Sequence, residues 1–162
     1  MKHVWRLVVA VLLGLPSSAH AADKAGSGAL WLKDCGKDGN GHEACIVEQF
    51  AVAMPQNVVA AHIRFSATGI ADQARMRLTV PLGVLLARGV TLSVDGSKPI
   101  ELPYERCTRD GCEASAVLDK TALATFTRGK TLDVRFATSE SQSVNIPIRL
   151  QGLADAMTQL SK

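Results

Sequence analysis

Aromatic residues are scarce in this sequence, and their scarcity bears on which ligands it can bind. They make up 4% of the 162 residues. Proteins that hold nucleic-acid bases or sugar rings by stacking need several aromatic side chains close together. Beyond the first 21 residues, the aromatic side chains are those of Trp31, Tyr104, Phe50, Phe65, Phe126 and Phe136. A stacking platform is therefore poorly supplied.

A large excess of charge of either sign is also absent. The chain has 18 basic and 15 acidic residues, a formal net charge of +3. Without Lys2 and Arg6, which lie in a segment that we expect to be removed, 16 basic residues face 15 acidic ones. Nucleic-acid-binding domains usually carry a strong basic excess. We therefore expect no nucleic-acid partner.

Motifs for catalysis or phosphate binding are missing too. No G-x-S-x-G nucleophile elbow occurs, and the "AGSGAL" segment lacks the Lys-Ser/Thr pair of a phosphate loop. Only His42 and His62 lie beyond residue 21, and His62 falls inside an expected strand. We predict a protein that is not an enzyme and has no cofactor. An enzyme of envelope polymers is a weaker alternative, which would show converging carboxylates in a cleft.

The first 21 residues have the pattern of an export signal. Lys2 and Arg6 precede an apolar run, and Ala19 and Ala21 form an A-x-A cleavage site. The run is shorter than the roughly 20 residues of a membrane span, and no later run approaches that length. We predict a signal peptide over 1–21, a flexible lead over 22–29 and one domain over 30–162. The mature chain should have no transmembrane segment and should be periplasmic or secreted.

Short segments with alternating apolar residues dominate the rest of the chain. Residues 74–81, 130–138 and 143–150 each contain apolar side chains at every second position, the pattern of a strand with one buried face. Pro147 lacks an amide donor, which favours an edge strand or a bulged one. Asp95-Gly96 is a hairpin turn signal. Together these features predict a mainly β fold, an antiparallel β-sandwich.

We also expect one or two short helices. The segment 119–129 offers Asp119 as its N-cap and Gly129 as the residue just past its end. The segment 152–160 places Leu153, Ala156, Met157 and Leu160 on one face, which should pack on the domain. An interaction or membrane helix is the weaker alternative there.

The four cysteines are even in number and lie beyond the signal segment, so we expect disulfides. They are Cys35, Cys45, Cys107 and Cys112. Three pairings are possible, and sequence alone does not choose among them. Local geometry favours Cys35–Cys45 and Cys107–Cys112, because the second pair flanks a "TRDG" turn in which Gly111 supplies a positive φ. A metal clip or a redox pair is a weaker alternative for Cys107 and Cys112, since further ligands or a C-x-x-C spacing are missing.

The loop between Cys35 and Cys45 resembles the front of a calcium-binding loop. The match fails at two ligand positions, which Gly36 and Val47 occupy instead of Asp and Glu. We therefore predict a disulfide-tied turn and no metal site. If the protein is instead a periplasmic small-ligand- or metal-binding module, Asp38, His42 and Glu43 are the residues to inspect.

Three arginines form a candidate interaction surface. Arg64, Arg75 and Arg77 would lie together if their strands are neighbours in the sheet. The alternative is a solvated sheet face on which acidic residues balance them.

Five segments of the sequence resemble a known family. The segments "PLGVLLARGVTLSVDG" and "CTRDGC", with "LWLKDC", "CIVEQ" and "VNIPIRLQGLADAM", are similar to the bacterial invasion-associated locus B family over nearly all of the mature chain. The resemblance implies an exported protein with a β-sandwich core, in which the four cysteines are disulfide partners. It supplies no catalytic residues. The family is named for host-cell invasion.

We therefore expect an exported, non-enzymatic binding protein of the cell envelope. Its partner would be a protein of the envelope or of a host, and host-cell interaction or invasion is the role that the resemblance implies. The apolar run over 83–86 is expected to be a core strand, since an exposed run would favour association.

Overall fold

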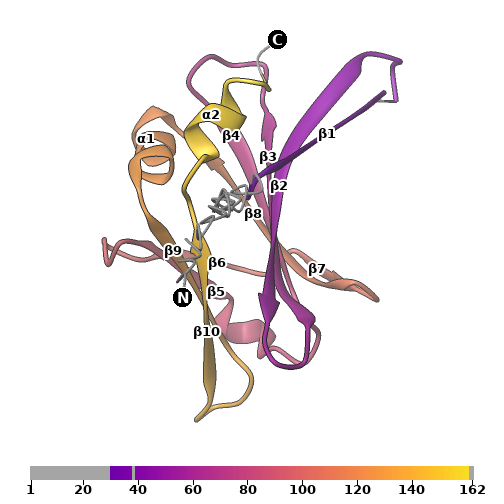
Figure 1. Cartoon of the computed structure of the whole chain (residues 1–162). Coiled ribbons are helices and arrows are strands. Elements are labelled where there is room, and N and C mark those ends of the chain that lie inside the picture. Colours follow the sequence, from indigo (N-terminus) through magenta and orange to yellow (C-terminus); the bar gives the residue numbers. More distant parts are fainter. Residues whose placement is uncertain (1–29, 38, 161–162) are drawn as a thin grey trace, which may run out of the picture.

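The computed structural model describes residues 30–37 and 39–160, which form two antiparallel β-sheets with two α-helices at one end (Figure 1). The predicted signal peptide over 1–21 and flexible lead over 22–29 lie outside the described residues. The first sheet has six strands, in the order β1 (Leu32–Lys37), β2 (Glu43–Ala53), β3 (Val58–Ala67), β4 (Ala74–Val80), β8 (Gly111–Leu118) and β7 (Arg106–Thr108). The second has four strands, in the order β10 (Ser143–Arg149), β9 (Thr131–Ala137), β5 (Val90–Val94) and β6 (Ile100–Leu102).

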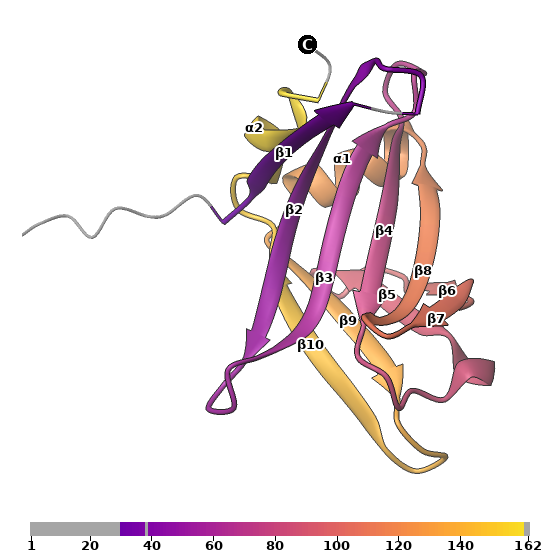
Figure 2. The same cartoon turned by 90° about the vertical axis from the view of Figure 1, so that its right-hand side faces the viewer.

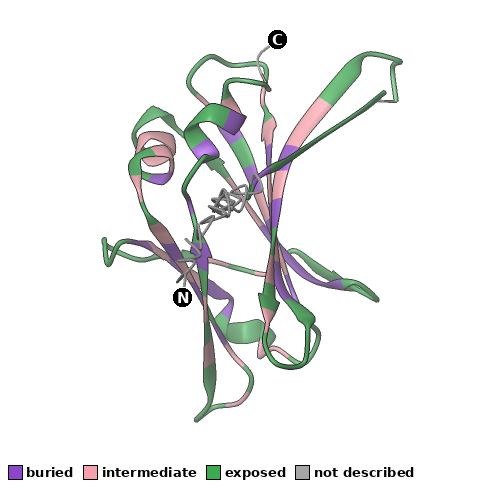
Figure 3. Cartoon of the chain, viewed as in Figure 1, coloured by how far each residue is buried: buried purple, intermediate pink, exposed green. Residues whose placement is uncertain are grey.

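The core lies between the two sheets, as the alternating segments predict. In β4 the side chains of Met76, Leu78 and Val80 are buried, while the residues between them face outward. Strand β9 buries Leu132 and Val134 in the same way. Figure 3 shows buried residues along the inner faces of both sheets. The predicted β-sandwich is confirmed.

Two short helices cover the upper end of the core, as expected. Helix α1 (Lys120–Arg128) links β8 to β9, and helix α2 (Leu153–Met157) follows β10. The Asp119 side chain caps α1 by accepting a hydrogen bond from the Ala122 amide at 2.8 Å. Phe126 of α1 packs edge-on against Phe65 of β3, with ring centroids 6.0 Å apart. The helices thus close the open end of the sandwich.

Two local expectations about turns and edges are confirmed. Asp95 and Gly96 have φ values of 49° and 73° at the turn between β5 and β6. Pro147 lies in β10, an edge strand of the four-stranded sheet. No helix in the described part of the chain has the length and apolar character needed to cross a membrane.

One expectation about the chain after β4 is wrong, and one about the end of α1 is confirmed. Residues 83–86 form no core strand: Gly83 has a φ of 91°, which breaks the extended run, and Leu86 is 59% exposed in a 3₁₀ turn, η1 (Leu86–Arg88). Gly129 directly follows the last residue of α1, as expected, and has an extended backbone with φ −68° and ψ 161°. Glycine is required there for space, because an added Cβ would lie 2.3 Å from Val94 Cγ1.

Candidate functional site

The outer face of the six-stranded sheet carries the candidate site. Figure 2 shows this face turned to the viewer, with the helices and the second sheet behind it. Because side chains alternate along each strand, the residues opposite the core positions project from this face. They include a cluster of charged side chains whose partners lie on β2, β3, β7 and β8.

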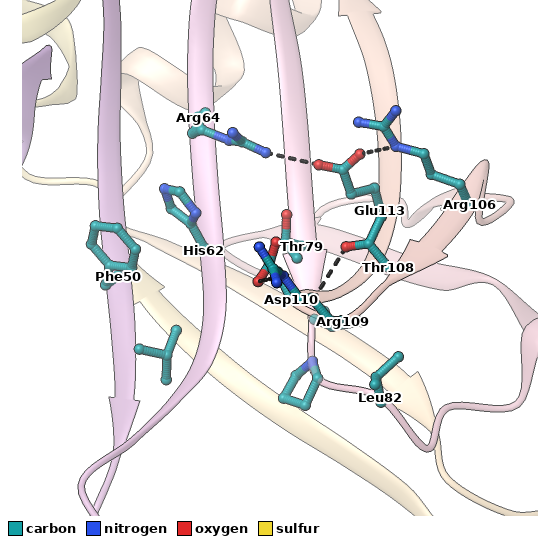
Figure 4. A pocket seen from close by; sticks show the side chains of 13 residues that line it. Phe50, His62, Arg64, Thr79, Leu82, Arg106, Thr108, Arg109, Asp110 and Glu113 are labelled. Atoms are coloured by element: carbon teal, nitrogen blue, oxygen red, sulfur yellow. Dashed lines mark hydrogen bonds and ion pairs between the residues drawn. The ribbon is translucent and has the colours of Figure 1, made fainter.

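A groove opens where this face meets the hairpin of β7 and β8. It encloses about 660 Å³ and is lined by residues of β2, β3, β4, β7 and β8 and of the loop after β4 (Figure 4). One part of its wall is apolar, with Phe50, Val59 and Leu82. The rest is polar and includes Arg64, Arg106, Thr108, Arg109 and Glu113.

Glu113 is the electrostatic centre of the groove. Its Oε1 accepts a hydrogen bond from Arg64 at 2.9 Å, and its Oε2 accepts one from Arg106 at 2.6 Å. Burial of this carboxyl group opposes its ionisation, but the Arg106 hydrogen bond and the charges of Arg106, Arg77 and Arg64 outweigh that effect, so its pKa lies below the usual value. Glu113 is therefore ionised at neutral pH, and three guanidinium groups face one carboxylate.

His62 lines the groove beside Phe50. Its Nε2 lies 2.7 Å from Glu48 Oε2, and its ring stacks on Phe50 with centroids 4.0 Å apart and an angle of 15°. Burial lowers the pKa of His62 below its ordinary value of 6.5; the Glu48 hydrogen bond opposes this shift, and the charge of Arg64 adds to it. The imidazole is therefore mainly neutral at pH 7. The prediction that His62 lies inside a strand is confirmed by its place in β3.

The structure brings the three predicted arginines together. Arg64 lies directly opposite Arg77 in the pairing of β3 with β4. Arg75 precedes Arg77 by two residues on β4, so its side chain lies on the same face of the sheet. Only Arg64 lines the large groove; all three line a smaller cavity of about 90 Å³ beside it. An acidic partner is also present, since Glu113 pairs with Arg64. The role of the three arginines in an interaction stays a prediction.

The predicted disulfides are present. Cys35 is bonded to Cys45, and Cys107 to Cys112. Each pair joins residues directly opposite each other on neighbouring strands, β1 with β2 and β7 with β8. The two disulfides therefore fasten the two edge strands of the same sheet.

Among the described residues, His42 and Glu43, which were named for a metal-binding alternative, share no group of possible metal ligands. Asp38 lies outside the described residues, and His42 is exposed on the turn before β2. Among the described residues, one group of three possible ligands occurs, and it joins Glu43 to Cys35 and Cys45. Both sulfur atoms of this group belong to the disulfide, so they are not available as thiolate ligands.

Comparison with known proteins identifies the family. A family model described as "Invasion associated locus B (IalB) protein" matches residues 31–161. The chain belongs to the invasion-associated locus B family. An IalB crystal structure, that of invasion associated protein B from Bartonella henselae, superposes with a TM-score of 0.73 at 29% identity, covering 82% of this chain and 91% of that one.

Two curated IalB relatives have similar sequences. Invasion protein B of Bartonella bacilliformis is 31% identical over 137 residues, covering 82% of this chain and 72% of the relative. An invasion protein B homolog of Brucella abortus is 31% identical over 120 residues, covering 72% of this chain and 68% of the relative. The resemblance seen in the sequence is thus confirmed.

Sequence reasoning missed most of the groove in this IalB protein. Phe50 of β2 and the charged residues Arg106, Arg109 and Glu113 of the β7–β8 hairpin were not singled out, because no motif links the hairpin to β2 and β3. The available signal was a polar residue at an alternating outward position, such as Glu113 between the buried residues Cys112 and Ala114. Outward position alone does not show which neighbour a residue meets, since that depends on strand order.

Proposed function

We propose that this IalB protein is an exported binding protein of the bacterial envelope that acts without catalysis. Its partner is a molecule of the envelope or of a host cell. Two observations support export: the signal pattern over 1–21, and the pairing of all four cysteines in disulfides, which oxidising compartments favour.

The groove on the outer sheet face carries this proposal. Its volume of about 660 Å³ and its mixed apolar and charged lining are typical of a recognition site. The titratable groups in and beside it bind one another: Glu113 holds two arginines, and His62 is engaged by Glu48 and Phe50. Such an arrangement supports binding better than proton transfer.

The names of the relatives support a role at the host interface. Both curated relatives are called invasion protein B or its homolog. We extend this role to the present chain as part of the proposal, with the outer face of the six-stranded sheet as the surface that meets the partner. A small-ligand-binding role would use the same groove, and the experiment below separates the two.

Site-directed crosslinking tests the proposal. A photo-crosslinkable residue replaces Leu82 or Thr108, which line the groove, or Arg149 on β10 as a control. Irradiation of producing cells, alone and with host cells, is followed by mass spectrometry of the captured proteins. We expect one partner to be captured from both groove positions and not from Arg149. Equal capture from all three positions, or no reproducible partner, contradicts recognition of a protein through this face.

A further inference from the structure

We propose that the groove binds an anionic amphiphile, a molecule with a carboxylate or phosphate head and a hydrocarbon or aromatic body. This inference rests on the proposed function in one respect, which is that recognition takes place on this face of the sheet. It adds the chemical class of the group that is bound.

The polar part of the groove has more cationic than anionic groups. Three arginines, Arg64, Arg106 and Arg109, line it against the two carboxylates of Glu113 and Asp110. Each guanidinium has five N–H donors, and Glu113 can accept only some of them. Glu113 takes one nitrogen of each of its two partners, Nη2 of Arg64 and Nε of Arg106, and the Arg106 side chain is 62% exposed. Donors therefore remain for a second anion beside Glu113.

The third of these arginines lies at the rim of the groove. The Arg109 side chain is 95% exposed, and its Nε is 3.9 Å from Asp110, a long contact for an ion pair. Exposed pairs of this kind contribute little energy. Arg109 can therefore turn toward an incoming anion at low cost. Figure 4 shows Arg64 and Arg106 directed at Glu113 from opposite sides, with Arg109 and Asp110 below them.

The opposite wall offers a surface for an apolar body. Phe50, Val59 and Leu82 are 43%, 50% and 57% exposed, although each is a large apolar residue. Exposed apolar side chains that gather at one site mark a binding surface. The neutral imidazole of His62 stacks on Phe50 and lies between this wall and Arg64. The groove thus passes from apolar to cationic, which matches an amphiphile with a negative head.

The size of the groove favours a single small molecule as the occupant. Small-molecule sites enclose about 300–1,000 Å³, and this groove has about 660 Å³. An amphiphile could be a free fatty acid or a lipid with a phosphate head, and the two sources share the chemistry that the groove recognises.

Calorimetric titration of the purified mature protein tests this inference. The probes are dodecanoate and dodecyl phosphate, each kept below its micelle concentration. The controls are dodecyltrimethylammonium, dodecyl maltoside and inorganic phosphate. We expect saturable binding of one anionic probe molecule per chain, with every control weaker by about tenfold or more. Preference for dodecanoate or for dodecyl phosphate separates a fatty acid from a phosphate lipid.

Paired variants place the binding in the groove. We expect Arg106→Gln and Leu82→Ser each to weaken binding by about fivefold or more. The matched controls are Arg135→Gln on β9 and Val117→Ser on β8, which are exposed residues outside the groove; they should bind like the unmodified protein. Circular dichroism confirms that all four variants are folded.

Three outcomes overturn the inference: no saturable binding of either anionic probe, equal binding of the cationic or neutral probes, or equal effects of the groove and control variants. Binding to vesicles of anionic phospholipid without binding of the monomeric probes also overturns it, since the groove would not be the site. If crosslinking from Leu82 and Thr108 succeeds while this titration fails, the ligand class is wrong and the recognition face stands.

Discussion

Arg64 on β3 and Glu113 on β8 form an ion pair with a distance of 2.9 Å, although β4 lies between their strands. The two residues are 49 positions apart in the sequence. The pair passes over the outer face of β4 and connects the middle of the sheet to its stapled edge. It also fixes the shape of the cationic part of the groove.

Replacing Glu113 should destabilise the domain. In Glu113→Gln the guanidinium groups of Arg64 and Arg106 lose their shared carboxylate, and we expect a loss of about 1–3 kcal/mol in the free energy of unfolding at pH 7. Urea denaturation measures it. The control is Glu140→Gln, which removes an exposed pair with Arg88 and should cost less than about 1 kcal/mol. Equal losses would show that the Glu113 cluster adds no special stability.

The cost of Glu113→Gln should depend on pH. The pKa of Glu113 is below its ordinary value of 4.5 in the folded protein. Its contribution to stability is therefore present above that ordinary value and is lost as the pH falls through the folded pKa. Urea denaturation of both proteins from pH 7 down to pH 3 should show their difference in stability shrinking in acid. A difference that stays constant or grows would contradict the lowered pKa.

His62 should make the domain sensitive to mild acid. Its pKa in the folded protein is below the ordinary value of 6.5, chiefly because of burial. The unfolded chain therefore binds a proton more readily, and stability falls as the pH drops below that ordinary value toward the folded pKa. We expect His62→Gln to lose less stability than the unmodified protein between pH 7.5 and about 5. Thermal melts across this range measure the difference, and an NMR titration midpoint of His62 above 6.5 would contradict it.

Removal of either disulfide should destabilise the domain, and the loss should increase with the number of residues in the loop that the disulfide closes. The chain-entropy model gives about 2 kcal/mol for Cys107–Cys112 and about 3 kcal/mol for Cys35–Cys45, whose sequence separations are 5 and 10. The double variants Cys107→Ala/Cys112→Ala and Cys35→Ala/Cys45→Ala, compared by urea denaturation, test this order. A larger loss at Cys107–Cys112 would show that packing of the buried Cys112 outweighs loop entropy.

Gly111→Ala should be much more harmful than Gly96→Ala. Both glycines have positive φ values, 137° and 73°. An added Cβ on Gly111 would lie 2.2 Å from the Val80 carbonyl oxygen, while nothing lies within 4 Å of the same position on Gly96. We expect a loss of about 2–4 kcal/mol for Gly111→Ala and about 1 kcal/mol for Gly96→Ala. Similar melting temperatures for the two variants would contradict the predicted clash.

Features that depend on neighbouring residues could be predicted from the sequence. The alternation around Met76 and Val134, the turn at Asp95-Gly96 and the cap at Asp119 each arise within a few residues, so pattern and physical chemistry suffice. The Cys107–Cys112 bond is equally local, because a tight turn between two strands brings its cysteines opposite each other.

The groove could not be predicted, because it depends on contacts between distant segments. Placing Glu113 beside Arg64 requires the strand order β3, β4, β8 and the register of both pairings. The error over residues 83–86 has a similar cause. Their apolar composition favours a buried strand, but Gly83 turns the chain and Leu85 donates its amide hydrogen bond to Ala137 of β9.

The pairing of each cysteine with the next one along the chain has a consequence for biogenesis. A chain that crosses the membrane from its N-terminus delivers Cys45 directly after Cys35, and Cys112 directly after Cys107, each within the same short hairpin. Oxidation in the order of arrival therefore yields the native bonds before the strands between the hairpins have assembled. This IalB protein should need a thiol oxidase for maturation but little help from a disulfide isomerase.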